Sequence, residues 1–90
     1  MKTFQTTIKN AFLIQVEKFE DERGYFMESW NLKKFNLPSF VQDNHSQSHR
    51  GILRGLHYQI EPRAQGKLVR CTRGAIYDVI VDLRQTSPSF

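Results

Sequence analysis

Hydrophobic and polar residues alternate over several short stretches of the chain, and a period of two residues is typical of strands. Phe12, Ile14 and Val16 share one parity, so this stretch is predicted to be a strand with one buried face. Other stretches rich in β-branched and aromatic residues predict strands at residues 25–30, 52–60, 67–72 and 75–83. The last of these, AIYDVIVDL, is apolar on both faces and is therefore predicted to be a central strand with cover on both sides.

Turn signals and one helix signal separate the predicted strands. Asp21–Gly24 and Arg73-Gly74 predict tight turns. Asn31 is a good N-cap, so a short helix is expected through Asn36, with Pro38 ending it. Residues 39–48 are predicted to be an ordered loop or a strand edge, and a loop and a turn are expected at residues 62–66 and 85–90. These elements predict an all-β chain with one short helix, whose open sheet edge needs cover from another chain.

The composition limits the class of protein. Ninety residues form at most one small domain, and a hydrophobic content of 39% excludes a disordered chain. The net charge of +4 favours anionic partners, but Lys33-Lys34 are the only adjacent cations, so we expect no nucleic-acid partner. The single cysteine, Cys71, fits a reducing compartment. No apolar run approaches the ~18 residues of a membrane span and the N-terminus lacks a signal-peptide core, so we expect a cytoplasmic protein without a membrane partner.

The segment Arg54–Gln59, RGLHYQ, contains the residues best suited to chemistry. His57 could take a proton from a carbon next to a carbonyl group, and Lys67 could hold the enolate oxygen that forms. Arg54 could bind a phosphate or carbonyl oxygen through two contacts. Strand alternation places Arg54 and His57 on opposite faces, but Gly55 permits a bulge that would bring them together. A hydrogen-bonded core histidine is an equally good interpretation of His57 alone.

Two other polar groups could bind a ligand. Arg23 and Glu28 flank the aromatic Phe26, and such a group can bind a nucleobase by stacking and hydrogen bonding. Its spacing alone favours a solvated turn followed by an ordinary strand. Gln42 and Asn44 share one strand parity and suit a sugar or a phosphate, while an Asx-type turn at a sheet edge explains them equally well.

A metal site is not favoured by the pattern of ligand-type residues. His45 and His49 lie in a polar stretch, His57 lacks the second histidine of a His-x-His pair, and Cys71 has no cysteine partner. Surface or structural histidines are the better interpretation.

Two further acidic residues fit a structural role. Asp78 and Asp82 share a face of the predicted strand at residues 75–83, where they are expected to pair with Arg84 or Arg70.

Several of these stretches together resemble one family. FEDERGYFMESWN, QDNHS, RGLHYQ and QGKLVR resemble the N-terminal half of dTDP-4-dehydrorhamnose 3,5-epimerases, and the resemblance runs from about Phe4 to Phe90. It implies a cupin-like β jelly roll, of which residues 1–90 would be the N-terminal part of a single domain with the C-terminal part absent. It also implies a homodimer that acts on dTDP-4-dehydro-6-deoxyglucose in dTDP-rhamnose and polysaccharide synthesis.

The resemblance also implies roles for individual residues. His57 falls on the family's proton acceptor, and Lys67 falls on the lysine near the C4 oxygen. Substrate-binding positions fall on Gln42, Asn44 and Arg54, and nucleotide-contacting positions that the family supplies across the dimer interface fall on Arg23 and Glu28. The resemblance implies no metal and no organic cofactor.

The length of the chain departs from the family pattern, because an eight-stranded jelly roll with added elements needs about twice as many residues. The family's supporting carboxylate, its proton-donating tyrosine and a further active-site histidine would lie in the other half. We therefore expect residues 1–90 alone to be inactive. Two alternatives stay open: a non-catalytic nucleotide-binding module, and an epimerase of the same family that acts at C3 only or at C5 only.

Overall fold

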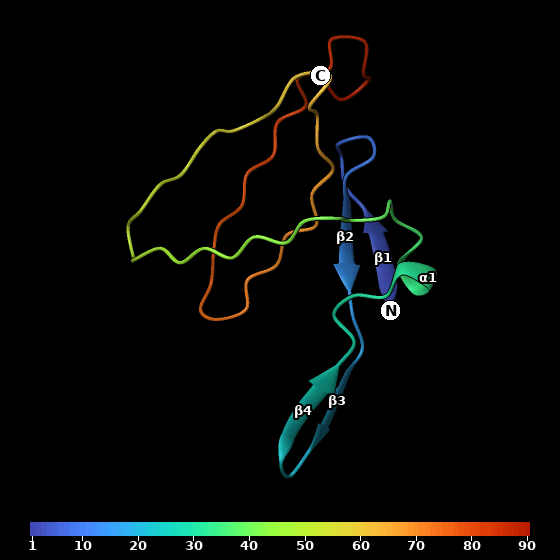
Figure 1. Cartoon of the computed structure of the whole chain (residues 1–90), viewed down its shortest axis with the longest axis vertical. Coiled ribbons are helices and arrows are strands. Elements are labelled where there is room, and N and C mark those ends of the chain that lie inside the picture. Colours follow the sequence, from blue (N-terminus) through green and yellow to red (C-terminus); the bar gives the residue numbers. More distant parts are fainter.

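The computed structural model describes all residues from Met1 to Phe90. Its regular elements all lie before residue 36 (Figure 1). They are β1 (Lys2–Gln5), β2 (Phe12–Gln15), β3 (Lys18–Asp21), β4 (Gly24–Met27) and α1 (Leu32–Phe35). Every regular element except α1 is a strand, which confirms the predicted all-β class with one short helix.

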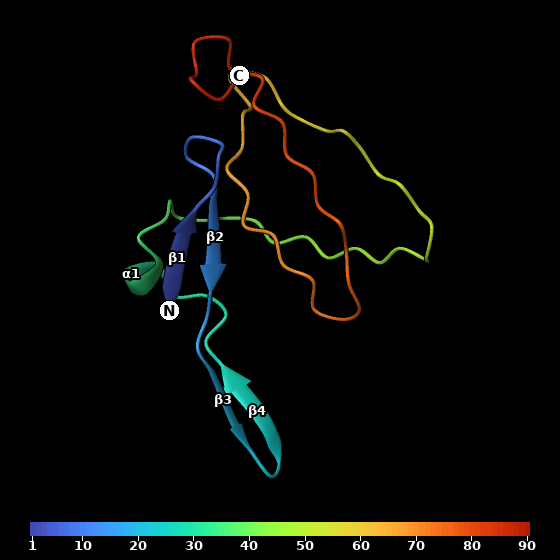
Figure 2. The same ribbon diagram turned by 180° about the vertical axis from the view of Figure 1, so that it is seen from behind.

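Two antiparallel hairpins form separate two-stranded sheets. β1 and β2 pair from Lys2 opposite Gln15 to Gln5 opposite Phe12, so the predicted strand at Phe12 is confirmed. In β3 and β4 the ladder ends with Asp21 opposite Gly24. Figures 1 and 2 show the β3–β4 hairpin projecting away from the β1–β2 hairpin rather than lying against it.

The turn between β3 and β4 is the one that the sequence predicts. The Asp21 carboxylate accepts the backbone N–H of Arg23 at 2.9 Å, which is a typical Asx-turn contact. Gly24 has a φ of +135°, a conformation that L side chains rarely adopt. β4 is shorter than predicted, because the ladder ends at Met27 rather than at Trp30.

Helix α1 confirms the predicted cap and length. The Asn31 side chain accepts the backbone N–H groups of Lys33 and Lys34 at 3.0 and 3.3 Å. Asn36 ends the helix in the left-handed conformation, with a φ of 46°. The small core of the chain lies here: Trp30 packs on Phe35 and on Phe40 with ring centroids 5.3 and 5.1 Å apart. Phe35 is the only buried hydrophobic residue, at 7% exposure.

Residues 36–90 contain no strand, so the predicted strands at 52–60, 67–72 and 75–83 are wrong for this structure. A strand requires a ladder of hydrogen bonds to a neighbour, and the backbone bonds in this region only close turns. The apolar side chains that these strands would bury are exposed, including Leu53 at 91% and Tyr77 at 95%. The predicted central strand at 75–83 is therefore neither paired nor covered.

The overall shape is open. The radius of gyration is 15.5 Å, whereas a compact domain of this length has roughly 12 Å. Figures 1 and 2 show the long irregular segments on one side of the two hairpins, with the C-terminal turn beyond the β1–β2 loop. That turn contacts the β1–β2 loop through two hydrogen bonds to Lys9. Arg84 pairs with Asp82 at 2.8 Å, as predicted.

Candidate functional site

The RGLHYQ segment lies in an irregular part of the chain, where His57 is exposed. The β-bulge expected at Gly55 does not form, because there is no strand for it to interrupt. Gly55 nevertheless has a φ of +117°, in the region that favours glycine. A Cβ atom placed there would meet His57 only at an ordinary contact distance of 3.7 Å. The backbone conformation, rather than lack of space, therefore calls for glycine beside His57.

Arg54 is held by the loop that precedes it. Its Nε donates to Ser48 Oγ at 2.8 Å, and its Nη2 donates to the Gln47 carbonyl oxygen at 2.9 Å. The guanidinium group is therefore oriented by residues six and seven positions earlier in the chain. Because an arginine has five N–H donors, donors remain on Arg54 for an anionic group.

Gln42 and Asn44 contact each other, since Gln42 Nε2 donates to Asn44 Oδ1 at 3.1 Å. Both residues are exposed. The pair leaves a carbonyl oxygen on Gln42 and an amide nitrogen on Asn44 for another partner. One acceptor beside one donor suits the hydroxyl groups of a sugar.

Arg23 and Glu28 stand at opposite ends of β4 and bind different partners. Arg23 donates from Nη2 and Nε to the Asp21 carboxylate at 2.6 and 3.1 Å, and this contact lowers the pKa of Asp21. Glu28 accepts Asn31 Nδ2 at 3.1 Å and pairs with Lys34 at 3.2 Å, and both contacts lower the pKa of the Glu28 carboxyl. Phe26 is 71% exposed, so its ring is open to a partner.

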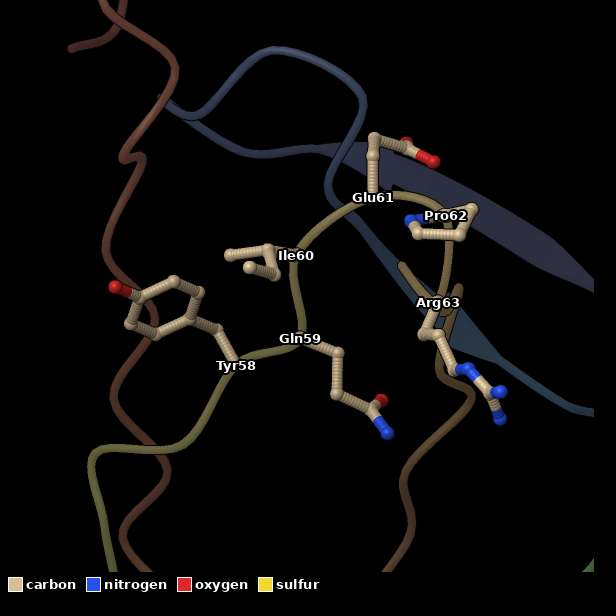
Figure 3. A pocket seen from close by; sticks show the side chains of 6 residues that line it. All are labelled: Tyr58, Gln59, Ile60, Glu61, Pro62 and Arg63. Atoms are coloured by element: carbon tan, nitrogen blue, oxygen red, sulfur yellow. The ribbon is translucent and has the colours of Figure 1, made fainter.

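No hydrogen bond or ion pair joins His57, Lys67 and Arg54 to one another. An open hollow directly after His57 in the sequence is lined by six consecutive residues, Tyr58–Arg63 (Figure 3). Figure 3 shows Gln59 and Arg63 projecting to one side of this segment and Ile60 to the other. A ligand pocket buries most of its ligand, and a hollow with walls from a single segment does not. The candidate catalytic residues are therefore not assembled into one pocket within residues 1–90.

Sequence reasoning missed the serine residues that orient charged groups. Ser48 holds Arg54, and Ser87 and Ser89 both donate to Asp82. The signal that could have found them was the SPS segment, whose two serines follow Asp82 by five and seven positions. No group of three or more His, Cys, Asp or Glu side chains is placed to hold a metal ion.

Comparison with known proteins identifies the family. A family model described as dTDP-4-dehydrorhamnose 3,5-epimerase matches residues 5–90. The chain belongs to this family. The match covers β2, the β3–β4 hairpin, α1 and every candidate site residue, so the resemblance carried by RGLHYQ and QGKLVR is confirmed.

Curated relatives that bear the name dTDP-4-dehydrorhamnose 3,5-epimerase come from bacteria and an archaeon. The Shigella flexneri and Pseudomonas aeruginosa proteins are each 53% identical over 95 aligned residues, which cover 100% of this chain and 52% of theirs. The Methanothermobacter thermautotrophicus protein is 51% identical over 90 residues, 96% of this chain and 48% of its own. The chain thus spans about half the length of these epimerases. No solved structure matches the chain. The single helix of the structure is too short to cross a membrane.

Proposed function

We propose that this chain is part of an enzyme that epimerises dTDP-4-dehydro-6-deoxyglucose at C3 and C5, in the synthesis of dTDP-rhamnose. The observation that carries the proposal is the family match over residues 5–90. It is supported by relatives about 50% identical over nearly the whole chain, which are named for this reaction. The net charge of +4 is suited to a substrate that carries a diphosphate.

The chemistry begins with the hydrogen on a carbon next to the C4 ketone. His57 removes this proton, and the electrons of the broken C–H bond form the C=C bond of an enolate whose charge rests on the C4 oxygen. Lys67 stabilises that oxygen with its positive charge. His57 is exposed and makes no hydrogen bond within the chain, so its imidazole is available as a base. A proton delivered to the opposite face then inverts the carbon centre.

Different residues bind different parts of the substrate. Arg54, oriented by Ser48, binds a phosphate oxygen, and the Gln42–Asn44 pair binds sugar hydroxyl groups. Arg23 and Glu28 bind the nucleotide of the neighbouring subunit in a homodimer. Arg23 is bonded to Asp21 at one end of β4, and Glu28 is bonded to Asn31 at the other end. The exposed ring of Phe26 lies between them in the sequence and is free to stack on a base. We place the enzyme in the cytoplasm.

An isotope experiment tests the reaction. A chimera would join residues 1–90 to the second half of the Shigella flexneri relative, and it would be incubated with substrate in heavy water. We expect deuterium at both C3 and C5 by NMR. Label at one position only would identify a single-site epimerase, and no label would contradict the proposal.

Residues 1–90 alone should show no inversion, because none of the assigned residues delivers a proton to the opposite face. Gel filtration with light scattering and a coupled assay for the epimerised sugar would test this. The exposed apolar side chains favour association of the isolated chain. A stable monomer with full turnover would contradict this expectation.

The shared site is tested by mixing two inactive variants of the chimera, Arg23→Ala and His57→Ala. In the mixed dimer, one site combines the intact His57 of one subunit with the intact Arg23 of the other. Random exchange of subunits in an equal mixture makes about half of the dimers mixed, each with one intact site of two, so about a quarter of the wild-type activity should return. Each variant alone is the control, and no recovery after confirmed subunit exchange would show that each site is built from one chain.

The non-catalytic alternative is favoured by one observation, namely that His57, Lys67 and Arg54 are not joined within this chain. It predicts that residues 1–90 bind dTDP without any exchange of substrate protons. Equilibrium dialysis of residues 1–90 with dTDP and with a dTDP-sugar tests this alternative. Salt-sensitive binding of both without preference for the sugar would favour the module, whereas exchange in the chimera would favour the enzyme.

A further inference from the structure

The most highly bonded side chain of the structure lies outside the candidate site. Asp82 is the only buried charged residue, at 8% exposure, and its side chain is 1% exposed. Arg84 donates to it from the backbone N–H at 3.1 Å, from Nε at 2.8 Å and from Nη2 at 3.0 Å. The hydroxyl groups of Ser87 and Ser89 each donate to Oδ2 at 2.5 Å. A buried carboxylate with this many donors holds the donating side chains in fixed orientations, so these side chains can in turn bind other groups.

Two of these donors also contact a residue near the other end of the chain. Arg84 Nη2 donates to the carbonyl oxygen of Lys9 at 2.6 Å, and the backbone N–H of Lys9 donates to Ser89 Oγ at 3.0 Å. Both backbone polar groups of Lys9 are therefore bonded by side chains 75 and 80 positions later. Lys9 lies in the loop between β1 and β2, which Figure 1 shows on the side of the C-terminal turn.

We propose that Asp82, Arg84, Ser87 and Ser89 form a main-chain clamp that holds the β1–β2 loop at Lys9. The clamp fixes the end of the 75–83 segment against the first hairpin, although no backbone ladder joins them. It would therefore set the position of a segment that follows the candidate site residues in the chain. This inference does not depend on the epimerase reaction.

The geometry assigns different tasks to the members of the clamp. Arg84 uses its planar, forked donors to reach Asp82 and the Lys9 carbonyl oxygen together, which a lysine could not do with the same geometry. Ser89 donates its proton to Asp82 and so presents a lone pair to the Lys9 N–H. The side chain of Lys9 takes no part in these bonds, so its identity should not matter.

The clamp is tested by hydrogen exchange of the Lys9 amide in residues 1–90, measured by mass spectrometry at single-residue resolution. Ser89→Ala should speed this exchange by about three- to tenfold, the range that one net hydrogen bond supports. Ser89→Thr keeps the hydroxyl group and should restore protection. Arg84→Lys should speed exchange by a similar factor.

Two matched variants complete the design. Lys9→Gln changes only a side chain that the clamp does not use, and Thr86→Ala alters the same turn at a residue without a hydrogen bond to Asp82. Both should leave exchange at residue 9 unchanged apart from the intrinsic effect of sequence. Equal exchange in wild type and Ser89→Ala would overturn the proposal. Failure of Ser89→Thr to restore protection would also overturn it, because the proposal requires only a hydroxyl group at residue 89. Restored protection would show that Ser89→Ala acts through this hydrogen bond and not through a general loss of folding.

Discussion

Residues 1–35 and residues 36–90 both contain stretches of strand-forming sequence, but only the first region contains strands. In the first region β1 pairs with β2 and β3 pairs with β4, so every strand has its partner next to it along the chain. Closing such short loops costs little conformational entropy. In the second region the predicted strands meet no partner, and their apolar side chains stay exposed. Alternation in sequence therefore becomes a strand only where a hydrogen-bonding neighbour is within reach.

The two regions also differ in the chemistry that they carry. His57, Lys67, Arg54 and the Gln42–Asn44 pair all belong to the irregular region. Arg23 and Glu28 belong to the region with regular hairpins. Active-site residues commonly lie on loops that a rigid scaffold positions. The question for experiment is therefore how far the irregular region depends on its scaffold.

The largest expected effect is the loss of proton exchange on removal of His57. In the chimera described above, His57→Ala should slow deuterium entry at C3 and C5 by about 10²–10⁴-fold, the usual contribution of a general base. His49→Ala is the matched control, because His49 is an exposed histidine of the same region with no assigned role. Label entry at the wild-type rate in His57→Ala would show that the irregular region does not supply the base.

A second large effect should follow from loss of the Lys67 charge. Lys67→Met should lower kcat by about 10²–10³-fold with a smaller change in KM, because the charge acts on an oxygen that becomes negative only during reaction. Lys33→Met, in helix α1, is the control in the other region. A raised KM with unchanged kcat would mean that Lys67 only anchors the substrate.

The sequence predicted the elements that depend on neighbours close along the chain. Asn31 and Asn36 mark the ends of α1, and Asp21–Gly24 forms the predicted turn. Each signal acts over a few residues, so no distant partner is needed to realise it. The family was also predictable, because RGLHYQ and QGKLVR are specific strings, and the match over residues 5–90 confirms it.

The sequence could not predict contacts between distant residues. The strand expected at 75–83 was wrong because a strand depends on a partner as much as on its own composition. The Ser48–Arg54 contact and the Ser89–Lys9 contact join residues 6 and 80 positions apart, and no periodic pattern marks either. The roles of His57 and Lys67 stay predictions, since the structure shows no contact between them.

A smaller effect is expected on stability, where removal of an aromatic ring should destabilise the first region but not the second. Phe35 is buried against Trp30, so Phe35→Ala should cost about 3 kcal/mol of local stability at α1. Tyr77 is 95% exposed, so Tyr77→Ala should change stability by less than about 0.5 kcal/mol. Hydrogen exchange of the amides near each residue measures both. A large cost for Tyr77→Ala would show that the second region packs in solution as the first region does.

The smallest effect concerns two carboxylates, one from each region. Hydrogen bonds from Asn31 and Lys34 lower the pKa of Glu28 from the ordinary value of 4.5. Hydrogen bonds from Arg84, Ser87 and Ser89 lower the pKa of Asp82 much further, because its carboxylate accepts more donors, and these outweigh the opposite effect of burial. A lowered pKa means that each contact stabilises the fold at neutral pH and loses that contribution as the pH falls through the folded-state value.

The two contacts should therefore fail in a fixed order during acidification. Glu28 should become protonated first and weaken the link between β4 and α1, while Asp82 should stay ionised to a lower pH and keep the clamp closed. Carboxyl ¹³C shifts followed by NMR from neutral to acidic pH would measure the order. Ser89→Ala removes one donor, so it should raise the pKa of Asp82 and leave that of Glu28 unchanged. If Asp82 titrated at or above Glu28, the clamp would not be the best-held contact of the chain, and the irregular region would lack its one fixed attachment to the first hairpin.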